Sequence, residues 1–371
     1  MKKLLFSLLC LLSIRTFTLA QQIPLDSTSA KDSSFYKRKT IIFPVIASAP
    51  ETSVQLGAVV MHFFKHGKSH SLTRTSYLQA LGSFTFNKQF NIGLSHHVFF
   101  DREKYISTGS LIFSKFPENF YGLGNQSLKD SQETVSYYSI NVTERILRKV
   151  YKKLFIGAQY SFVRLFDVSF QAPERFSNES IIGKQGGNVS GLGPSIIWDS
   201  RSSVLNSFSG SYVEISSYFN RTALGSDFNF NSYVFDARKY IPLKNKKGIL
   251  ALQAYVNLHT GQTPFRQLSM LGGNSIMRGY YAGRYRDNDL AAVQAEYRSP
   301  LFIANKWGFV LFAAAGEVAP VVKDFKVDAI KPTYGAGLRR VINKKENLNL
   351  RIDVAFGNNT SAFYLTIAES F

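Results

Sequence analysis

Apolar and polar residues alternate along most of the chain, and this period of two predicts β-strands. Residues 347–356 read NLNLRIDVAF, so leucine, isoleucine, valine and phenylalanine share one face while asparagine, arginine and aspartate share the other. Residues 248–261 repeat the pattern. Sixteen such segments can be counted, at approximately residues 40–48, 53–66, 71–87, 89–101, 105–116, 136–149, 153–170, 188–200, 210–221, 228–243, 248–261, 288–301, 307–319, 332–343, 348–358 and 361–371.

The first residues predict export. Lys2 and Lys3 precede an apolar run over residues 4–14, which is too short to span a bilayer, and Ala20 ends a small-x-small cleavage pattern. Cys10 is the only cysteine and lies in this run, so the mature chain is expected to lack disulfides and thiolate chemistry. The predicted division is a cleaved signal peptide (1–20), a disordered periplasmic segment rich in Ser, Asp and Lys (21–39) and a membrane domain (40–371).

The connections between the strands fall into two classes. The longest, 117–135, 171–187 and 262–287, follow odd-numbered segments, whereas the connections after even-numbered segments are short. A soluble sandwich also alternates, but long loops on one side and tight turns on the other are typical of outer-membrane barrels. Because every backbone group must be paired in hydrocarbon, such strands have to close. The sequence therefore predicts an all-β fold, a 16-stranded antiparallel transmembrane β-barrel of the Gram-negative outer membrane.

Charge and composition change this prediction little. The net charge of +19 could indicate a nucleic-acid partner, but an exported chain with 14% aromatic residues in alternating segments does not fit one. A wet face and a lipid face explain the same composition. We therefore expect outer-membrane lipid and lipopolysaccharide around the protein and no nucleic acid.

Candidate catalytic and metal-binding chemistry is sparse. His62, His66 and His70 have a spacing of four, but the alternation around them and Gly67 place them on a strand end and a turn rather than on a helix. No Gly-x-Ser-x-Gly elbow is found, and no helix is predicted after the Gly-x-Gly triplets at 122–124 and 335–337, which echo nucleotide-binding loops. The sequence predicts no enzyme, no metal site and no cofactor.

One loop carries the most specific motif of the chain. Gly272 and Gly273, followed by Arg278, Gly279 and Tyr280, lie just before the twelfth predicted strand, which contains the run AEYRSPL. This arrangement resembles the BamA/TamA superfamily of outer-membrane assembly factors and two-partner secretion translocators (the bacterial surface antigen family). Members have sixteen-stranded barrels with an Arg-Gly-Phe/Tyr signature in this loop. The resemblance covers essentially the whole mature chain.

The resemblance implies that the loop folds back into the lumen. Arg278 would then meet acidic groups on the inner wall, with Glu296 matching the wall glutamate of the family. A guanidinium in a lumen is stable when a carboxylate accepts its fork of donors. Where relatives carry Phe-x-Asp on the next strand, this chain has Phe312 and Ala314, so one acidic partner is missing. Either the lock is weaker, or Glu317 acts from elsewhere.

Further similarities lie outside this loop. The residues WDSR at 198–201 and FYGLGN at 120–125 echo the family, as does the aromatic Phe371. Phe371, with Phe363, Leu365 and Ile367 on its face, resembles the recognition signal for barrel insertion, and Glu369 interrupts that face.

The function implied is outer-membrane protein assembly, insertion or translocation. Residues 21–39 are too few for the polypeptide-transport-associated domains of relatives, so a barrel-only member is expected, with unfolded clients and separate periplasmic partners. The resemblance implies a seam that opens between the first and last strands, and Pro44 in the first strand suits such a seam, although it equally suits the start of an ordinary pairing. The alternative function is a passive channel or structural barrel that has lost the client pathway.

Overall fold

The computed structural model describes residues 38–49, 53–65, 75–86, 89–115, 117–172, 181–203, 206–343, 348–367 and 369–371. Within these ranges the chain forms strands, turns and short 3-10 helices, and no α-helix occurs. None of the helical segments described has the length and apolar character needed to cross a membrane.

One sheet contains seventeen of the strands found in the described residues. Its first nine are β1 (Lys39–Ala49), β2 (Ser53–Phe64), β3 (Ser76–Thr85), β4 (Phe90–Phe100), β5 (Tyr105–Lys115), β6 (Glu118–Phe120), β7 (Glu133–Tyr151), β8 (Leu154–Phe170) and β9 (Gly187–Asp199). The others are β10 (Gly210–Asn220), β11 (Phe230–Pro242), β12 (Ile249–Gly261), β15 (Asp289–Arg298), β16 (Trp307–Ala319), β17 (Lys331–Asn343), β18 (Leu348–Gly357) and β19 (Thr360–Ile367).

Two smaller kinds of element complete the fold. β13 (Ser269–Leu271) and β14 (Tyr285–Asp287) form a separate two-stranded sheet. The 3-10 helices lie at Lys129–Ser131, Thr222–Leu224, Lys244–Lys246, Val322–Asp324 and Val327–Ala329.

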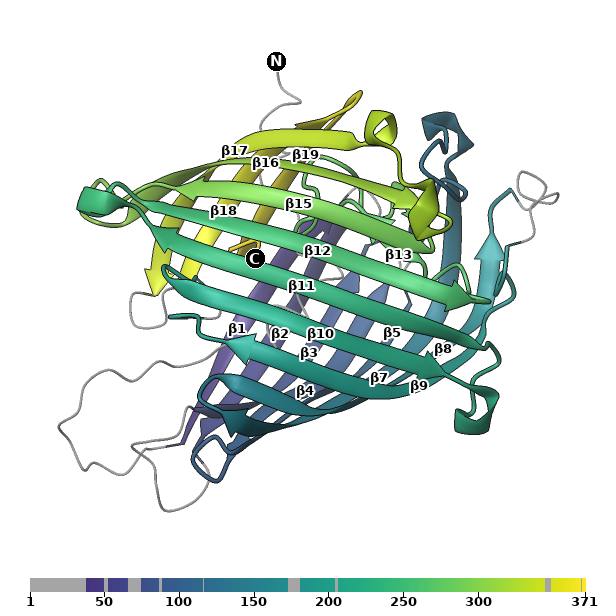
Figure 1. Cartoon of the computed structure of the whole chain (residues 1–371), viewed down its shortest axis with the longest axis horizontal. Coiled ribbons are helices and arrows are strands. Elements are labelled where there is room, and N and C mark those ends of the chain that lie inside the picture. The colour runs from purple at the N-terminus through teal and green to yellow at the C-terminus, as the bar shows by residue number, and fades with distance from the viewer. Residues whose placement is uncertain are drawn as a thin grey trace.

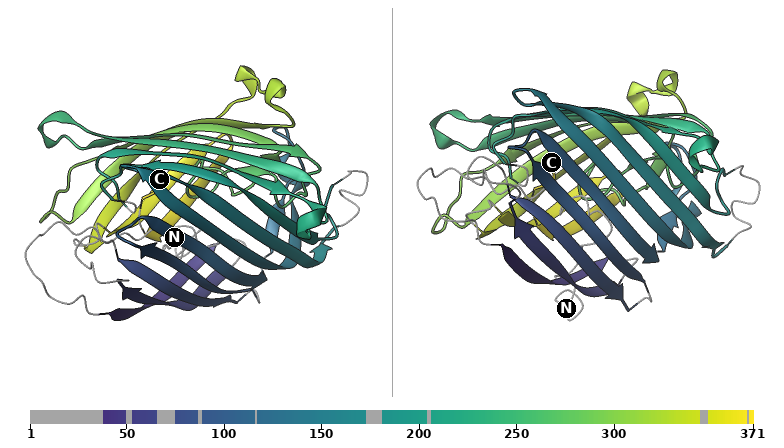
Figure 2. Two further views of the ribbon diagram at one scale, coloured as in Figure 1. Left: turned by 60° about the horizontal axis from the view of Figure 1, so that its bottom comes forward. Right: turned by 90° about the horizontal axis from the view of Figure 1, so that it is seen from below.

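Strands that follow one another in the chain pair in antiparallel fashion, from β1 with β2 through to β18 with β19. β5 and β6 both pair with β7, and β12 pairs with β15 across the excursion that contains β13 and β14. The sheet curls back on itself, so that the purple N-terminal strands β1–β4 lie across an interior from the green strands β12 and β15 (Figures 1 and 2).

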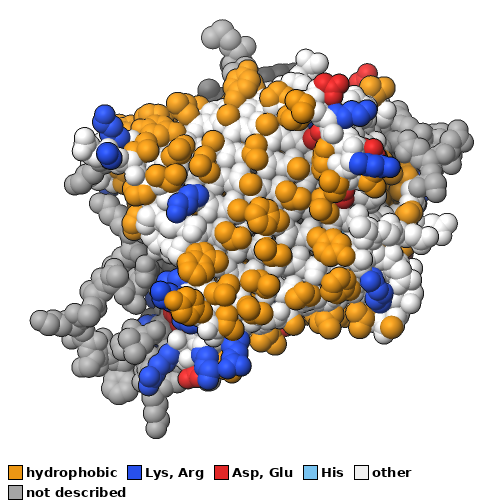
Figure 3. All heavy atoms as spheres, viewed as in Figure 1, with side chains coloured by type: hydrophobic (Ala, Val, Ile, Leu, Met, Phe, Trp, Pro, Cys, Tyr) orange, Lys and Arg blue, Asp and Glu red, His pale blue; other side chains and the backbone are white. Residues whose placement is uncertain are grey.

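The distribution of polarity is the reverse of that in a soluble protein. Outward-facing apolar side chains such as Leu94, Ile146 and Val293 are more than half exposed, at 56%, 56% and 57%. Hydrophobic side chains cover the face over β10–β12 and β15, and the lysines and arginines in that view lie mainly toward its margins (Figure 3). The inner wall is polar, as Gln253 and Gln294 illustrate, both being buried. An apolar exterior around a polar interior is typical of membrane barrels.

The structure confirms the prediction of an all-β antiparallel fold, since each of the sixteen predicted segments overlaps a strand of the large sheet. β6, β13 and β14 were not predicted and lie within the two long connections 117–135 and 262–287. The predicted signal peptide, residues 21–37, His66 and His70 lie outside the described residues.

Candidate functional site

The connection 262–287 turns from the end of β12 onto the inner face of the curved sheet. Met277 donates its backbone N–H to Oε1 of Gln294 at 3.2 Å, and Nε2 of Gln294 donates to the carbonyl of Ser275 at 2.7 Å. Met277 and Tyr280 also pack in a buried apolar cluster with Leu290 of β15. The loop is therefore attached to the wall by backbone, amide and apolar contacts.

The glycines of the motif let the loop approach the wall closely. Gly279 has a φ of +115°, and its backbone N–H donates to the hydroxyl of Tyr364 on β19 at 3.0 Å. A Cβ at this position would lie 2.9 Å from the carbonyl oxygen of Phe356. At the base of the loop, the N–H of Gly273 donates to the carbonyl of Tyr280 at 2.9 Å, and Gly272 also has a positive φ.

Arg278 lies in the centre of the site and is 1% exposed. Its Nη2 is 2.5 Å from Oε2 of Glu296 on β15, and its Nη1 is 2.5 Å from Oδ2 of Asp353 on β18. The guanidinium carbon also lies 3.5 Å from the centre of the Phe312 ring on β16. Each amino group therefore meets its own carboxylate while the guanidinium carbon lies over an aromatic ring, which is a favourable arrangement for a buried arginine.

The structure brings together Arg278 and Glu296, as the sequence predicted, and shows where the missing acidic partner comes from. Asp353 supplies the second carboxylate from β18, two strands away from Ala314 on β16. Among the described residues, Arg278 forms its ion pairs with Glu296 and Asp353, whereas Oε2 of Glu317 accepts the backbone N–H of Lys326 at 3.1 Å in the next connection. The second carboxylate beside Arg278 is therefore that of Asp353 and not that of Glu317.

Tyr280 fixes the far side of the motif. Its hydroxyl donates to the carbonyl of Pro332 at 3.3 Å and accepts the N–H of Asn358 at 2.9 Å. Its ring meets that of Tyr285 edge-on, with 5.5 Å between the ring centres. The loop therefore spans the interior from β15 to the β17 and β18 strands.

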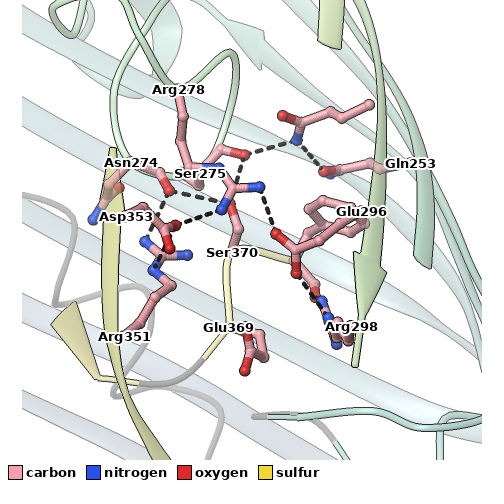
Figure 4. A network of polar contacts seen from close by, with 12 residues as sticks. Gln253, Asn274, Ser275, Arg278, Glu296, Arg298, Arg351, Asp353, Glu369 and Ser370 are labelled. Carbon is pink, nitrogen blue, oxygen red and sulfur yellow. Dashed lines mark hydrogen bonds and ion pairs between the residues drawn. The ribbon is translucent and has the colours of Figure 1, made fainter. Parts of the chain in front are cut away.

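Charged residues of the wall extend the contacts of Arg278 into what we call the interior network. It consists of Arg278, Glu296, Arg298, Arg339, Arg351, Asp353 and Glu369, all at most 5% exposed. Figure 4 labels all of these residues except Arg339. Nε of Arg298 donates to Glu296 at 2.8 Å, and Nη1 of Arg339 donates to Asp353 at 2.5 Å. Four guanidinium groups and three side-chain carboxylates thus occupy one buried region, where removal of one partner leaves the remaining charges uncompensated.

The residues after β19 also enter this network, which the sequence did not predict. Nε of Arg339 donates to Glu369 at 2.7 Å, and the hydroxyl of Ser370 donates to the carbonyl of Asn274 in the loop at 3.1 Å. Phe371 is buried inside against Tyr240 and Ala251 of β11 and β12.

The predicted insertion signal is therefore split between two faces. Phe363 and Leu365 pair with Val354 and Ile352 on the outer side of β18. Phe371 does not share their face, because it packs inside the sheet against Tyr240 and Ala251. The side chain of Ile367, the last residue of β19, is outside the part of the chain that the structure describes. The pairing of Glu369 with Arg339 accounts for the inward position of the segment, since a carboxylate is poorly placed on the apolar exterior.

A second set of contacts joins the connection 262–287, which we call the motif loop, to the loop after β5. Arg286 is fully buried, and its Nη1 lies 3.3 Å from Oε1 of Glu118, whose Oε2 is 2.8 Å from Nη1 of Arg266. The carbonyl of Arg286 accepts the N–H of Gly124 at 2.8 Å, and its guanidinium lies 5.1 Å from the Phe120 ring centre. The FYGLGN run is thus a contact surface for the motif loop.

The run WDSR lies away from the loop, on β9 and the turn that follows it. Nε of Arg201 donates to Asp199 at 2.9 Å, and the guanidinium lies 4.4 Å from the centre of the Tyr212 ring. These contacts fasten the turn to β10.

Comparison with known proteins agrees with this geometry. The model of the Omp85 superfamily domain matches residues 28–371. No curated protein sequence matches the chain. Among solved structures, BamA from Haemophilus ducreyi lacking POTRA domains 1–3 is 14% identical with a TM-score of 0.59, over 90% of this chain and 70% of that one.

Two CdiB structures share the fold as well. CdiB from Acinetobacter baumannii is 10% identical with a TM-score of 0.56, over 89% of this chain, and CdiB from Escherichia coli is 9% identical with a TM-score of 0.58, over 88%. The chain spans 65% and 61% of their lengths, less than two thirds. At such identities the likeness concerns the fold, and the family model decides the relationship: the chain belongs to the Omp85 superfamily.

Proposed function

We propose that the chain closes into a sixteen-stranded outer-membrane barrel that takes part in the insertion or translocation of other proteins. β5 and β6 share one partner, β7, so the seventeen strands of the large sheet occupy sixteen places around it. An even number of antiparallel strands is usual for barrels of this membrane. The apolar exterior and polar interior support the same placement.

The observation that carries the proposal is the double ion pair of Arg278. It holds the motif loop against the inner wall through Glu296 and Asp353, deep inside the sheet. In the family that the sequence resembles, this motif belongs to assembly factors and translocators. The arrangement needs no catalytic residue, because positioning a loop and offering a strand edge are binding functions.

The proposed route for a client is a seam between the first and last strands. The pairings of the described residues join β1 to β2 and β19 to β18. Pro44 has no backbone N–H to donate and is exposed on β1, which suits a weakly paired edge. A client strand would add to this edge by β-augmentation. The partners of the protein would be unfolded outer-membrane proteins and periplasmic assembly factors, and lipid and lipopolysaccharide would surround the barrel.

Depletion of the protein tests this function. We expect quantitative mass spectrometry of outer-membrane fractions to show the loss of a defined set of barrel or secreted proteins. Expression of the wild type or of the Arg148→Ala variant, whose altered side chain is exposed on β7, should restore them. A series of cysteine pairs along β1 and β19 should block the restoration when oxidised. An unchanged proteome after depletion would favour a passive channel or a structural barrel.

A further inference from the structure

The segment Glu369–Phe371 is buried inside the sheet, and each of its side chains makes a different kind of contact. We call the space that this segment occupies the cleft. The carboxylate of Glu369 accepts hydrogen bonds from Arg339 at 2.7 Å and from Nδ2 of Asn349 at 3.0 Å. The hydroxyl of Ser370 donates to loop carbonyls, and the ring of Phe371 packs on Tyr240. Each residue of the segment is therefore recognised by its own chemistry.

The backbone of the segment is also recognised. Nη2 of Arg298 donates to the main-chain oxygen of Phe371 at 2.9 Å, and the same guanidinium lies 5.7 Å from the centre of the Phe371 ring. These residues follow the end of β19, and the contacts named here are made by side chains of the wall rather than by a strand ladder. A bound peptide of the same composition would find the same set of partners.

A cavity of about 680 Å³ opens beside the segment. Its lining combines Arg298, Arg339 and Glu369 with apolar residues that include Phe208 and Phe309. Its size and its mixture of an apolar lining with a few polar groups are usual for ligand sites. A longer segment than the three residues now present would therefore have room.

The charges of the cleft favour an acidic occupant. The interior network contains three side-chain carboxylates for four guanidinium groups, and one of the three is that of Glu369 itself. Nη2 of Arg339 makes no hydrogen bond, and the Glu296 carboxylate lies 3.8 Å from it. Withdrawal of Glu369 would leave Arg339 with less compensation, so the cleft is suited to another carboxylate.

We propose that this cleft is a binding site for a polypeptide segment that carries a carboxylate and an aromatic ring two residues apart. Glu369–Phe371 occupies it within the chain, and a client segment of the same chemistry replaces it. The proposal rests on the function proposed above, because it assumes that clients enter the interior. It adds the chemical class of segment that the interior selects.

A change of the segment in the cleft would alter the contacts of the motif loop. Ser370 contacts the carbonyls of Asn274 and Ser275, and Arg298 shares the Glu296 carboxylate with Arg278. Exchange of the segment would thus change the contacts on both sides of the motif. The segment acts as an internal competitor that keeps the site filled while no client is present.

A peptide-binding experiment tests the proposal. The probe is a fluorescein-labelled peptide of residues 360–371, and the receptor is the purified full chain with Glu369→Gln, Ser370→Gly and Phe371→Ala, compared with the wild type in the same detergent. We expect the peptide to bind the triple variant at least tenfold more tightly than the wild type. A control peptide with the same three substitutions should bind the triple variant at least tenfold more weakly than the unaltered peptide.

Both peptides keep residues 360–367, so strand addition at an edge would treat them alike. Equal binding of the two peptides, or no binding to a triple variant that shows the gel shift of a folded barrel between unboiled and boiled samples, would overturn the proposal. This readout does not depend on insertion activity. If depletion leaves the outer-membrane proteome unchanged but the peptides bind as expected, the cleft is still a peptide-binding site. The proposal that a client protein occupies it would then be lost.

Discussion

Nη1 of Arg278 lies 2.5 Å from Oδ2 of Asp353, although 75 positions of the chain separate the two residues. The contact joins the motif loop to β18, and the contact of Arg278 with Glu296 joins the same loop to β15. One side chain therefore ties together two parts of the wall that are not neighbours in the sheet.

Arg278→Ala should destabilise the barrel strongly. It leaves Glu296 and Asp353 with less compensation in a buried region, and breaking one partner of a buried ion pair typically costs about 3–5 kcal/mol. The measurement is the unfolding temperature in detergent, followed by the gel shift between unboiled and boiled samples. Arg148→Ala removes an exposed arginine from β7 and should leave this temperature nearly unchanged. Equal effects of the two variants would contradict the buried role of Arg278.

Arg278→Ala and Glu296→Gln should not be additive. Once the guanidinium is absent, neutralising the facing carboxylate removes part of the penalty, so the double variant should cost little more than either single one. Directly contacting residues commonly show interaction energies of about 0.5–3 kcal/mol in such a cycle. Chemical denaturation of the four proteins under one set of conditions measures it. Costs that simply add would show that the two residues act independently.

Asp353→Asn and Glu317→Gln should separate the two acidic residues that could replace the family aspartate. Asp353 contacts Arg278 and Arg339, so its neutralisation should cost about 2 kcal/mol or more. Glu317 accepts a backbone N–H from Lys326, and a glutamine oxygen can accept the same bond, so that change should cost less than about 1 kcal/mol. The reverse order of unfolding temperatures would refute the assignment of Asp353.

Gly279→Ala should loosen the loop without touching a charge. The φ of +115° is unfavourable for alanine, a penalty of about 1–3 kcal/mol, and the new methyl group would press on the carbonyl of Phe356. The expected result is a lower unfolding temperature together with faster hydrogen exchange of the loop amides. Gly225→Ala is the matched control, because Gly225 also has a positive φ but has nothing within 4 Å of its Cβ position. A similar loss in both variants would attribute the effect to φ alone.

Arg286→Ala should open the contact between the two long connections. The buried guanidinium pairs with Glu118, so its removal should expose the loops to added protease. We expect faster cleavage within residues 262–287 by proteinase K on intact cells. Lys323→Ala changes an exposed residue of a neighbouring connection and should have little effect. Unchanged cleavage of the Arg286 variant would show that other contacts suffice to hold the loops.

Much of the sheet could be predicted from the sequence because its strands are long and alternate between a lipid face and a wet face. β13 and β14 were missed for the opposite reason, since three residues are too short to show a period. The alternation also misled at the end of the chain. It placed Phe371 on the outer face by continuing the pattern of β19, whereas the Glu369 carboxylate follows Arg339 inward.

The site was predicted in part. Glu296 could be paired with Arg278 because the motif and its strand lie close together in the chain and resemble a family pattern. Asp353 was visible as a polar residue on the wet face of a strand, but no local signal connects it to a loop 75 positions earlier. Glu118 likewise has its partners, Arg266 and Arg286, in a distant connection. Arg339 and Arg351 reach Asp353 over shorter distances, from the neighbouring strand β17 and from β18 itself.

The position of the interior network along the chain determines when its contacts can form during folding of the barrel. Its charged members all lie between Arg278 and Glu369, so β1 to β12 can pair before any of them is in place. Arg278 has one acceptor, Glu296, only 18 positions later in the chain, but it needs β18 in place to gain the second, Asp353. The fastening of the loop is therefore a late event, which can occur only when nearly the whole wall exists.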